Sequence, residues 1–459
     1  MHPGSGAYVR PTLKTLLTLA WPVIVQRAAQ VVVGFTDAVM VADLGEASLA
    51  AVTTGSTNSF LAFILPMGMV FVVASFSSQL FGKGDLAGAR RYGWTGLVVA
   101  LLAGLFSAAT TLVVEPGVAL FGYAPDVAKD MTTYLEIRLL GAGFVVGLEA
   151  LGAFYGGLGN TRLPMFAQVL AMVMNVFLNW VLIYGHLGSP AYGVTGAAWA
   201  SVLATVIGFV VLFVCFWRQV GHAKVEGRAT FVVADLWRLV RFGLPSGLNW
   251  FFEFAAFAFF INVVVTALGT TALAALMAVL QLNSVSFMPA FGLASAGAVF
   301  VGQAIGADQK DDVKGILKLT IAVMAAWQGL VGLLYLLVPG LLLIPFEVEA
   351  LAGTAFLSVA VWMLRLSSAW QLFDALVNGV GEALRAAGDT AFTLWARLAM
   401  AWTLFVPGAW FAVRTYEGGV TAAMIALVAY MAALSLVLWL RFENGAWRKI
   451  ELTDPTTGA

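Results

Sequence analysis

Long apolar stretches separated by short polar breaks run through the whole chain. Each stretch is continuously apolar rather than alternating, and most exceed the roughly 20 residues that a helix needs to cross the hydrocarbon of a bilayer. A membrane barrel would instead show short alternating strands. The pattern predicts an all-α membrane protein with twelve transmembrane helices, at residues 14–41, 48–81, 92–115, 128–158, 163–185, 192–217, 238–267, 272–305, 315–341, 350–381, 391–413 and 419–441.

Composition supports this class and excludes several functions. Hydrophobic residues make up 61% of the chain and charged residues 10%, against roughly 45–50% and 25% in a soluble domain. A net charge of zero argues against nucleic acid as a partner. With one cysteine and three histidines, a Cys- or His-rich metal centre is not expected. Neither a Walker-type phosphate loop nor a nucleophilic catalytic set is found, so we expect no enzyme, no catalytic residues and no cofactor.

The distribution of basic residues predicts the orientation in the membrane. Only Lys129 and Arg414 fall in odd-numbered loops, whereas the termini and the even-numbered loops carry most of the other lysines and arginines. Because cytoplasmic loops are enriched in basic residues, both termini are expected in the cytoplasm. Four arginines remain inside predicted spans: Arg27, Arg138, Arg365 and Arg397.

The two halves of the chain resemble each other. The segment LGEASLAAV at 44–52 matches LGTTALAAL at 268–276, and GNT at 159–161 matches GDT at 388–390. Six spans precede the break, so the repeats share one orientation. We therefore expect a first six-helix lobe at 1–217, a cytoplasmic linker at 218–236 and a second lobe at 237–459. Parallel repeats with a substrate site between them are a recurrent transporter design.

Three acidic residues inside predicted spans stand out: Asp37, Glu253 and Asp374. An ionisable side chain at the centre of a membrane helix costs roughly 2.5–3.5 kcal/mol on insertion scales. Such residues are retained chiefly where they pair or where they act, so these three are the candidates for binding a coupling cation.

Amide and aromatic side chains accompany two of the acids. Asn249 lies one turn before Glu253, and Asp374 lies between Trp370 and Asn378, each one turn away. Carboxylate and amide oxygens suit a hard cation, which makes Glu253 and Asp374 candidate Na⁺ ligands. Repulsion between two carboxylates also makes one of them a ready proton acceptor. These residue types leave Na⁺ and H⁺ coupling open.

A further polar group is expected near Asp37. Asn175 and Asn179 lie one turn apart on the fifth span, and Ser201 on the sixth span can join them. Amides of this kind also stabilise helix packing, by roughly 0.6–2 kcal/mol, so a supporting role and a packing role both stay open. The same choice between pairing and function is open for Glu149, Arg138 and Arg365.

Several ordered motifs carry a family resemblance. They are LAWPVIV and GFTDAVMVADLG in the first span, YGGLGNTRLPM before the fifth, LNWVLIYGHLGSPAYGVTGAAWAS across the fifth and sixth, GLPSGLNWFFEFAAF in the seventh and FDALVNGVGEALRAAGDT in the tenth. With these motifs the chain resembles the MATE family (multidrug and toxic compound extrusion), in its NorM-like branch.

The resemblance implies the MATE/MOP fold, a V-shaped pair of six-helix lobes that works by alternating access. It implies export of organic cations against Na⁺ or H⁺, with a cation site in the second lobe formed by Glu253 and Asp374 beside Trp370. Asp37 matches the acid of the first span. Asn179 stands where archaeal and DinF-type members carry an aspartate, which weakens a first-lobe cation site.

Further expectations follow from this resemblance. We expect a monomer in the inner membrane, with lipids and small cationic drugs as partners. One alternative is a flippase for lipid-linked precursors, of the same superfamily, which needs a basic cavity for pyrophosphate. A receptor or membrane enzyme is a second alternative, and it would need a soluble domain or a catalytic set.

Overall fold

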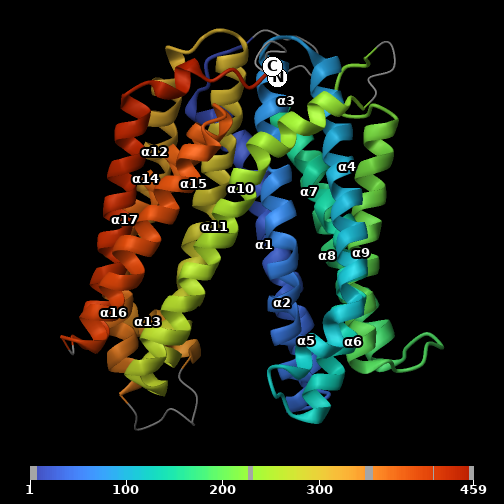
Figure 1. Ribbon diagram of the computed structural model, residues 1–459, viewed down its shortest axis with the longest axis vertical. Coiled ribbons are helices and arrows are strands. Elements are labelled where there is room, and N and C mark those ends of the chain that lie inside the picture. Colours follow the sequence, from blue (N-terminus) through green and yellow to red (C-terminus); the bar gives the residue numbers. More distant parts are fainter. Residues whose placement is uncertain (1–7, 226–230, 347–354, 417, 454–459) are drawn as a thin grey trace. The chain divides into compact units, whose positions relative to one another are not determined.

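The structure is all-helical over the part of the chain that it describes. The computed structural model describes residues 8–225, 231–346, 355–416 and 418–453, and every regular element in these ranges is a helix (Figure 1). In these ranges eleven helical segments are long and apolar enough to cross a membrane, and one bent pair of helices makes a twelfth if it is a single span. The prediction of an all-α protein with about twelve spans is confirmed, and residues 350–354 of the predicted tenth span lie outside the described residues.

Contacts divide the chain into two compact units, which we call unit 1 and unit 2. Over the described residues unit 1 is mainly Pro22–Gly247, and unit 2 combines Val9–Trp21 with Leu248–Asp454. Unit 1 contains most of α1 (Leu13–Ala42) and the helices α2 (Glu46–Val70), α3 (Val72–Gly82), α4 (Leu86–Thr110), α5 (Val114–Ala119), α6 (Pro125–Leu140), α7 (Ala142–Gly157), α8 (Arg162–Tyr184) and α9 (Gly193–Trp217).

Unit 2 repeats this plan. It contains the second half of α10 (Val233–Phe259) and the helices α11 (Thr270–Gly306), α12 (Asp312–Leu337), α13 (Pro339–Leu343), α14 (Phe356–Ala386), α15 (Thr390–Ala399), α16 (Val406–Arg414) and α17 (Gly419–Glu443). Two short π-helices interrupt its spans, Phe260–Val265 after α10 and Met400–Phe405 after α15. No feature of the sequence predicts them.

The fourth span of each unit is central. In unit 1, α7 contacts α2, α3, α4 and α9, and in unit 2, α14 contacts α11, α12, α15 and α17. The predicted span 128–158 is in fact bent by 45° between α6 and α7. Gly141 lies at the break, where a Cβ atom would come within 2.9 Å of the Val202 side chain on α9. A glycine there allows the close approach of α9.

The repeated GNT/GDT turn binds the end of the sixth span of each unit or the chain directly after it. Gly159 and Gly388 both have a positive φ, of 80° and 91°. In unit 1 the Asn160 amide donates to the Gly221 carbonyl at 2.9 Å. In unit 2 Asp389 accepts from Arg441 at 2.8 Å. The sequence repeat thus corresponds to a repeated structural role.

The segment 218–225, directly after α9, is held against unit 1 by side chains of α7 and of the turn after it. Tyr155 donates its hydroxyl to the Val220 carbonyl at 2.9 Å, and the Asn160 amide donates to the Gly221 carbonyl at 2.9 Å. His222 packs edge-on against Phe154, with 5.7 Å between the ring centroids. Burial, and to a lesser degree the charge of Arg90, lowers the pKa of His222 below its usual 6.5.

Acid should therefore release this segment. A histidine with a lowered pKa in the docked state binds fewer protons there than when released, so its contribution is present above the ordinary pKa and is lost as the pH falls through the lowered one. We expect hydrogen-exchange protection of 218–225, corrected for intrinsic rates, to drop between about pH 7.5 and about pH 5. The His222→Phe variant should remove the pH dependence. Equal protection at both pH values in the unchanged protein would contradict the assignment.

Candidate functional site

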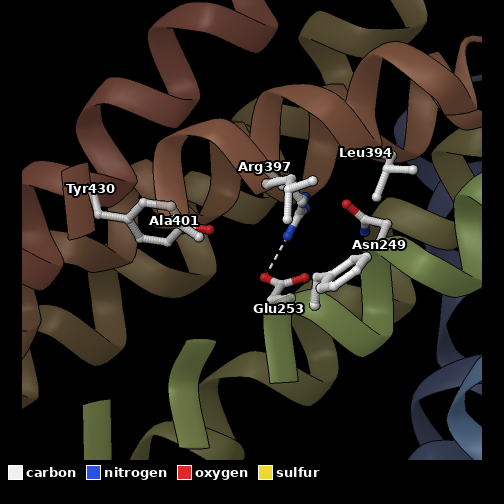
Figure 2. Close-up of a pocket in the computed structure, with 8 residues that line it drawn as sticks. Asn249, Glu253, Leu394, Arg397, Ala401 and Tyr430 are labelled. Carbon is white, nitrogen blue, oxygen red and sulfur yellow. Dashed lines mark hydrogen bonds and ion pairs between the residues drawn. The ribbon is translucent and has the colours of Figure 1, made fainter. Parts of the chain in front are cut away.

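Glu253 of α10 forms an ion pair with Arg397 of α15 in unit 2. The Arg397 Nη1 and Glu253 Oε1 atoms are 2.5 Å apart (Figure 2). The Arg397 side chain is 12% exposed and the Glu253 side chain 39%. A carboxylate in oil normally loses its charge unless a cation lies beside it, and the protein supplies that cation itself.

A pocket opens beside this ion pair. Figure 2 shows Asn249 and Glu253 projecting from α10 toward Arg397, with Tyr430 of α17 on the other side. Among the described residues the buried Asn249 Oδ1 atom accepts no hydrogen bond. The remaining lining is apolar: Phe252, Leu394, Leu398 and Ala401. The pocket therefore combines a partly accessible carboxylate with apolar walls and one spare amide oxygen.

The second acid of unit 2 is held by amides. Asp374 of α14 is 7% exposed. Its Oδ2 atom accepts from Gln328 of α12 at 2.6 Å, and its Oδ1 atom accepts from Asn378, one turn later, at 2.8 Å. Two N–H donors, one on each oxygen, suit an ionised carboxylate. Trp370, one turn earlier on α14, is 7% exposed.

The two acids do not share a hydrogen bond, and Arg397 connects them electrostatically. Arg397 interacts by charge with both Glu253 and Asp374. Within the described ranges no group of three or more His, Cys, Asp or Glu side chains could hold a metal ion. A bound Na⁺ would therefore depend on these two carboxylates and on neighbouring amide oxygens.

The helices that carry the ion pair lose regular α-geometry close to it. The π-helix after α10 begins seven residues beyond Glu253, and the π-helix after α15 begins three residues beyond Arg397. The Phe260 and Phe405 rings of these two segments lie 5.0 Å apart. Single π-turns occur often at functional sites.

In unit 1 the structure brings the predicted polar group together around Asp37. The Asp37 carboxylate accepts from Asn179 of α8 at 2.5 Å and from Ser201 of α9 at 2.8 Å. Asn175 joins them, donating to Ser201 at 3.2 Å and accepting from Asn179 at 3.3 Å. All four side chains are buried. The arrangement links α1, α8 and α9 through one carboxylate.

Of the three intramembrane charges whose roles were open, only Arg138 interacts with one of these groups, by charge with Asp37. Glu149 of α7 accepts from Arg27 through both oxygens, at 3.1 and 3.2 Å, and from Gln30 at 2.7 Å, which makes it a pairing residue. The Arg138 guanidinium lies 6.0 Å from the centre of the Phe63 ring. Arg365 is exposed.

Two residues of the site in unit 2, Arg397 and Gln328, are not predicted from the sequence. Arg397 is visible as a charge inside a predicted span, and the cost of a lone charge in oil implies a partner. Gln328 gives no such signal, because an isolated amide in an apolar span also occurs as a packing residue. Both partnerships join helices far apart in sequence, so periodicity alone could not predict them.

These features define a class: an all-helical membrane protein of two repeated units, each with a buried carboxylate held in a polar group. Comparisons with known proteins identify it more closely. A protein-family model described as MatE matches residues 22–181 and 245–411. The chain belongs to the MATE family of membrane transporters, whose members are not enzymes.

Named relatives match over nearly the whole chain. A probable multidrug resistance protein NorM of Agrobacterium fabrum is 30% identical over 441 residues, which cover 89% of this chain and 91% of the relative. The multidrug resistance protein PmpM of Pseudomonas aeruginosa is 28% identical over 460 residues, covering 97% and 94%. A solved structure of a multidrug resistance MATE family transporter in its outward-facing conformation has a TM-score of 0.84 at 21% identity, covering 95% of this chain and 97% of that one.

Proposed function

We propose that this protein is a multidrug efflux antiporter that exports cationic, amphiphilic organic compounds in exchange for Na⁺ or H⁺ by alternating access. The observation that carries the proposal is the acidic pair of unit 2, Glu253 and Asp374, inside the membrane-spanning region. Glu253 is 39% exposed and borders a pocket with apolar walls. An amphiphilic organic cation and a small coupling cation can compete for the accessible part of this carboxylate.

Coupling follows from competition and from the two lobe arrangements. Binding of one cation at Glu253 and Asp374 favours release of the other, and different affinities in the inward-open and outward-open arrangements turn this competition into exchange. The predicted lobes, 1–217 and 237–459 with the linker 218–236, supply these arrangements. Trp370, Asn378 and Asn249 support this cation site. In unit 1 Asp37 is a further candidate for cation coupling, supported by Asn175, Asn179 and Ser201.

The cellular setting belongs to the same proposal. The protein is proposed to be a multi-pass inner-membrane monomer. Both termini are placed in the cytoplasm, because basic residues concentrate in the termini and the even-numbered loops. The flippase alternative is disfavoured by the pairing of two intramembrane arginines with acids, Arg27 with Glu149 and Arg397 with Glu253. Neither guanidinium is then available to a pyrophosphate.

One preparation of proteoliposomes tests the function and its ion. Vesicles are loaded with the lipophilic cation tetraphenylphosphonium, and efflux is started by a Na⁺ jump or by a pH jump. We expect efflux only when an inward cation gradient is imposed. Efflux driven by Na⁺ at constant pH identifies Na⁺ as the coupling ion, and efflux driven by a pH gradient without Na⁺ identifies H⁺. Efflux equal to that of protein-free vesicles under both gradients would contradict the proposal.

A further inference from the structure

The polar centre of unit 2 carries one more negative charge than positive. Glu253 and Asp374 supply two carboxylates, and Arg397 supplies one guanidinium that interacts with both. One further acid, Glu382, lies within electrostatic range of Arg397 but is already ion-paired with Arg385. The described groups around Arg397 therefore sum to a single negative charge.

We propose that Arg397 is a resident counter-ion that holds the acidic pair at one net negative charge, so that unit 2 binds one positive charge at a time. The proposal rests on the function proposed above and adds the charge capacity of its cation site. A Na⁺, a proton or a monovalent organic cation would each neutralise the centre, and a second cation would then meet no net attraction.

The geometry favours Arg397 as a counter-ion that stays in the site over a role limited to holding two helices together. The Arg397 side chain is 12% exposed, whereas its partner Glu253 is 39% exposed, so part of the carboxylate stays accessible while the guanidinium is covered. Figure 2 shows the Arg397 guanidinium projecting between the α10 side chains and Tyr430. A bound cation can thus reach Glu253 while Arg397 stays in place, and the buried Asn249 Oδ1 atom can serve as a further ligand.

The proposal predicts a charge rescue. Glu253→Gln alone leaves Arg397 to neutralise Asp374, so the centre becomes neutral and cation binding should fall by about tenfold or more. Adding Arg397→Gln to that variant restores one net negative charge on Asp374. Binding of tetraphenylphosphonium by the purified protein, measured by isothermal titration calorimetry, should then recover to within about threefold of the unchanged protein.

A control that leaves the net charge unchanged is available on α14, the helix that carries Asp374. The double variant Glu382→Gln/Arg385→Gln removes an acid and a base together, and it should leave the affinity for tetraphenylphosphonium unchanged. If Glu253→Gln/Arg397→Gln does not give a monodisperse protein, Glu253→Gln/Arg397→Leu makes the same charge change with an apolar side chain. If Arg397 served only to hold α10 against α15, neither double variant should recover the binding of tetraphenylphosphonium.

The unchanged protein gives an independent measurement. Na⁺, or H⁺ if the efflux assay assigns it, should displace tetraphenylphosphonium competitively with a Hill coefficient of about one, because one charge fills the centre. A coefficient near two, or a double variant as weak as Glu253→Gln alone, would overturn the counter-ion role. Wild-type binding by Glu253→Gln itself would instead overturn the proposed coupling site, so the two failures are distinct.

Discussion

Neutralising either carboxylate of unit 2 should abolish ion-driven efflux. Glu253→Gln and Asp374→Asn each remove one of the two negative charges and leave Arg397 facing a single carboxylate. The centre then has no net charge with which to attract a coupling ion. Loss of the net negative charge should lower the affinity for the coupling cation by about tenfold or more.

The measurement is the initial rate of tetraphenylphosphonium efflux under an imposed Na⁺ or pH gradient, normalised to the amount of reconstituted protein. Both substitutions are nearly isosteric, so the variants should insert and elute like the unchanged protein. Asp311→Asn is the control, because this carboxylate is 95% exposed and pairs with Arg448 at the surface. Surface pairs are worth about 0–1 kcal/mol, so its rate should stay within about threefold. Full activity of both carboxylate variants would remove the coupling site from unit 2.

The spans are the part of the fold that the sequence specifies best. A helix in lipid must satisfy all its backbone hydrogen bonds internally and must match the bilayer in length. These two constraints are visible as apolar runs of a given length. The bend at Gly141 and the π-helices at Phe260–Val265 and Met400–Phe405 are not, because they depend on which neighbouring helix packs there.

The two polar groups differ in how far they could be predicted. Asn175 and Asn179 were placed near Asp37 because their spacing puts both on one face of a helix next to the span of Ser201, and the structure brings the four together. For Glu253 the spacing predicts only Asn249 as a neighbour, one turn earlier, and not its arginine. Arg397 follows it by 144 residues, and no local pattern encodes which of several intramembrane acids a distant arginine meets.

Asp37→Asn should slow transport strongly while leaving cation binding in unit 2 intact. The Asp37 carboxylate accepts hydrogen bonds from Asn179 and Ser201, at 2.5 and 2.8 Å. An asparagine amide directs its own N–H group toward one of these donors, so at least one hydrogen bond is lost or reversed. Hydrogen bonds to a charged group contribute about 1.5–3 kcal/mol, and the same amount in a transport step lowers the rate by about 10- to 100-fold.

The comparison of two assays on this variant assigns a role to unit 1. If Asp37 serves the movement of α1 against α8 and α9, the efflux rate falls while Na⁺ or H⁺ displaces tetraphenylphosphonium with unchanged affinity, because the acidic pair of unit 2 is not altered. If Asp37 is itself the coupling site, the rate and the displacement fail together. Asp130→Asn is the matched control, since this carboxylate also accepts a serine hydroxyl, from Ser48 at 3.0 Å, but lies near the start of α6 in a less buried setting. An efflux rate for Asp37→Asn equal to that of Asp130→Asn would show that the Asp37 group only supports packing. Cation binding during transport would then depend on the carboxylates of unit 2 alone.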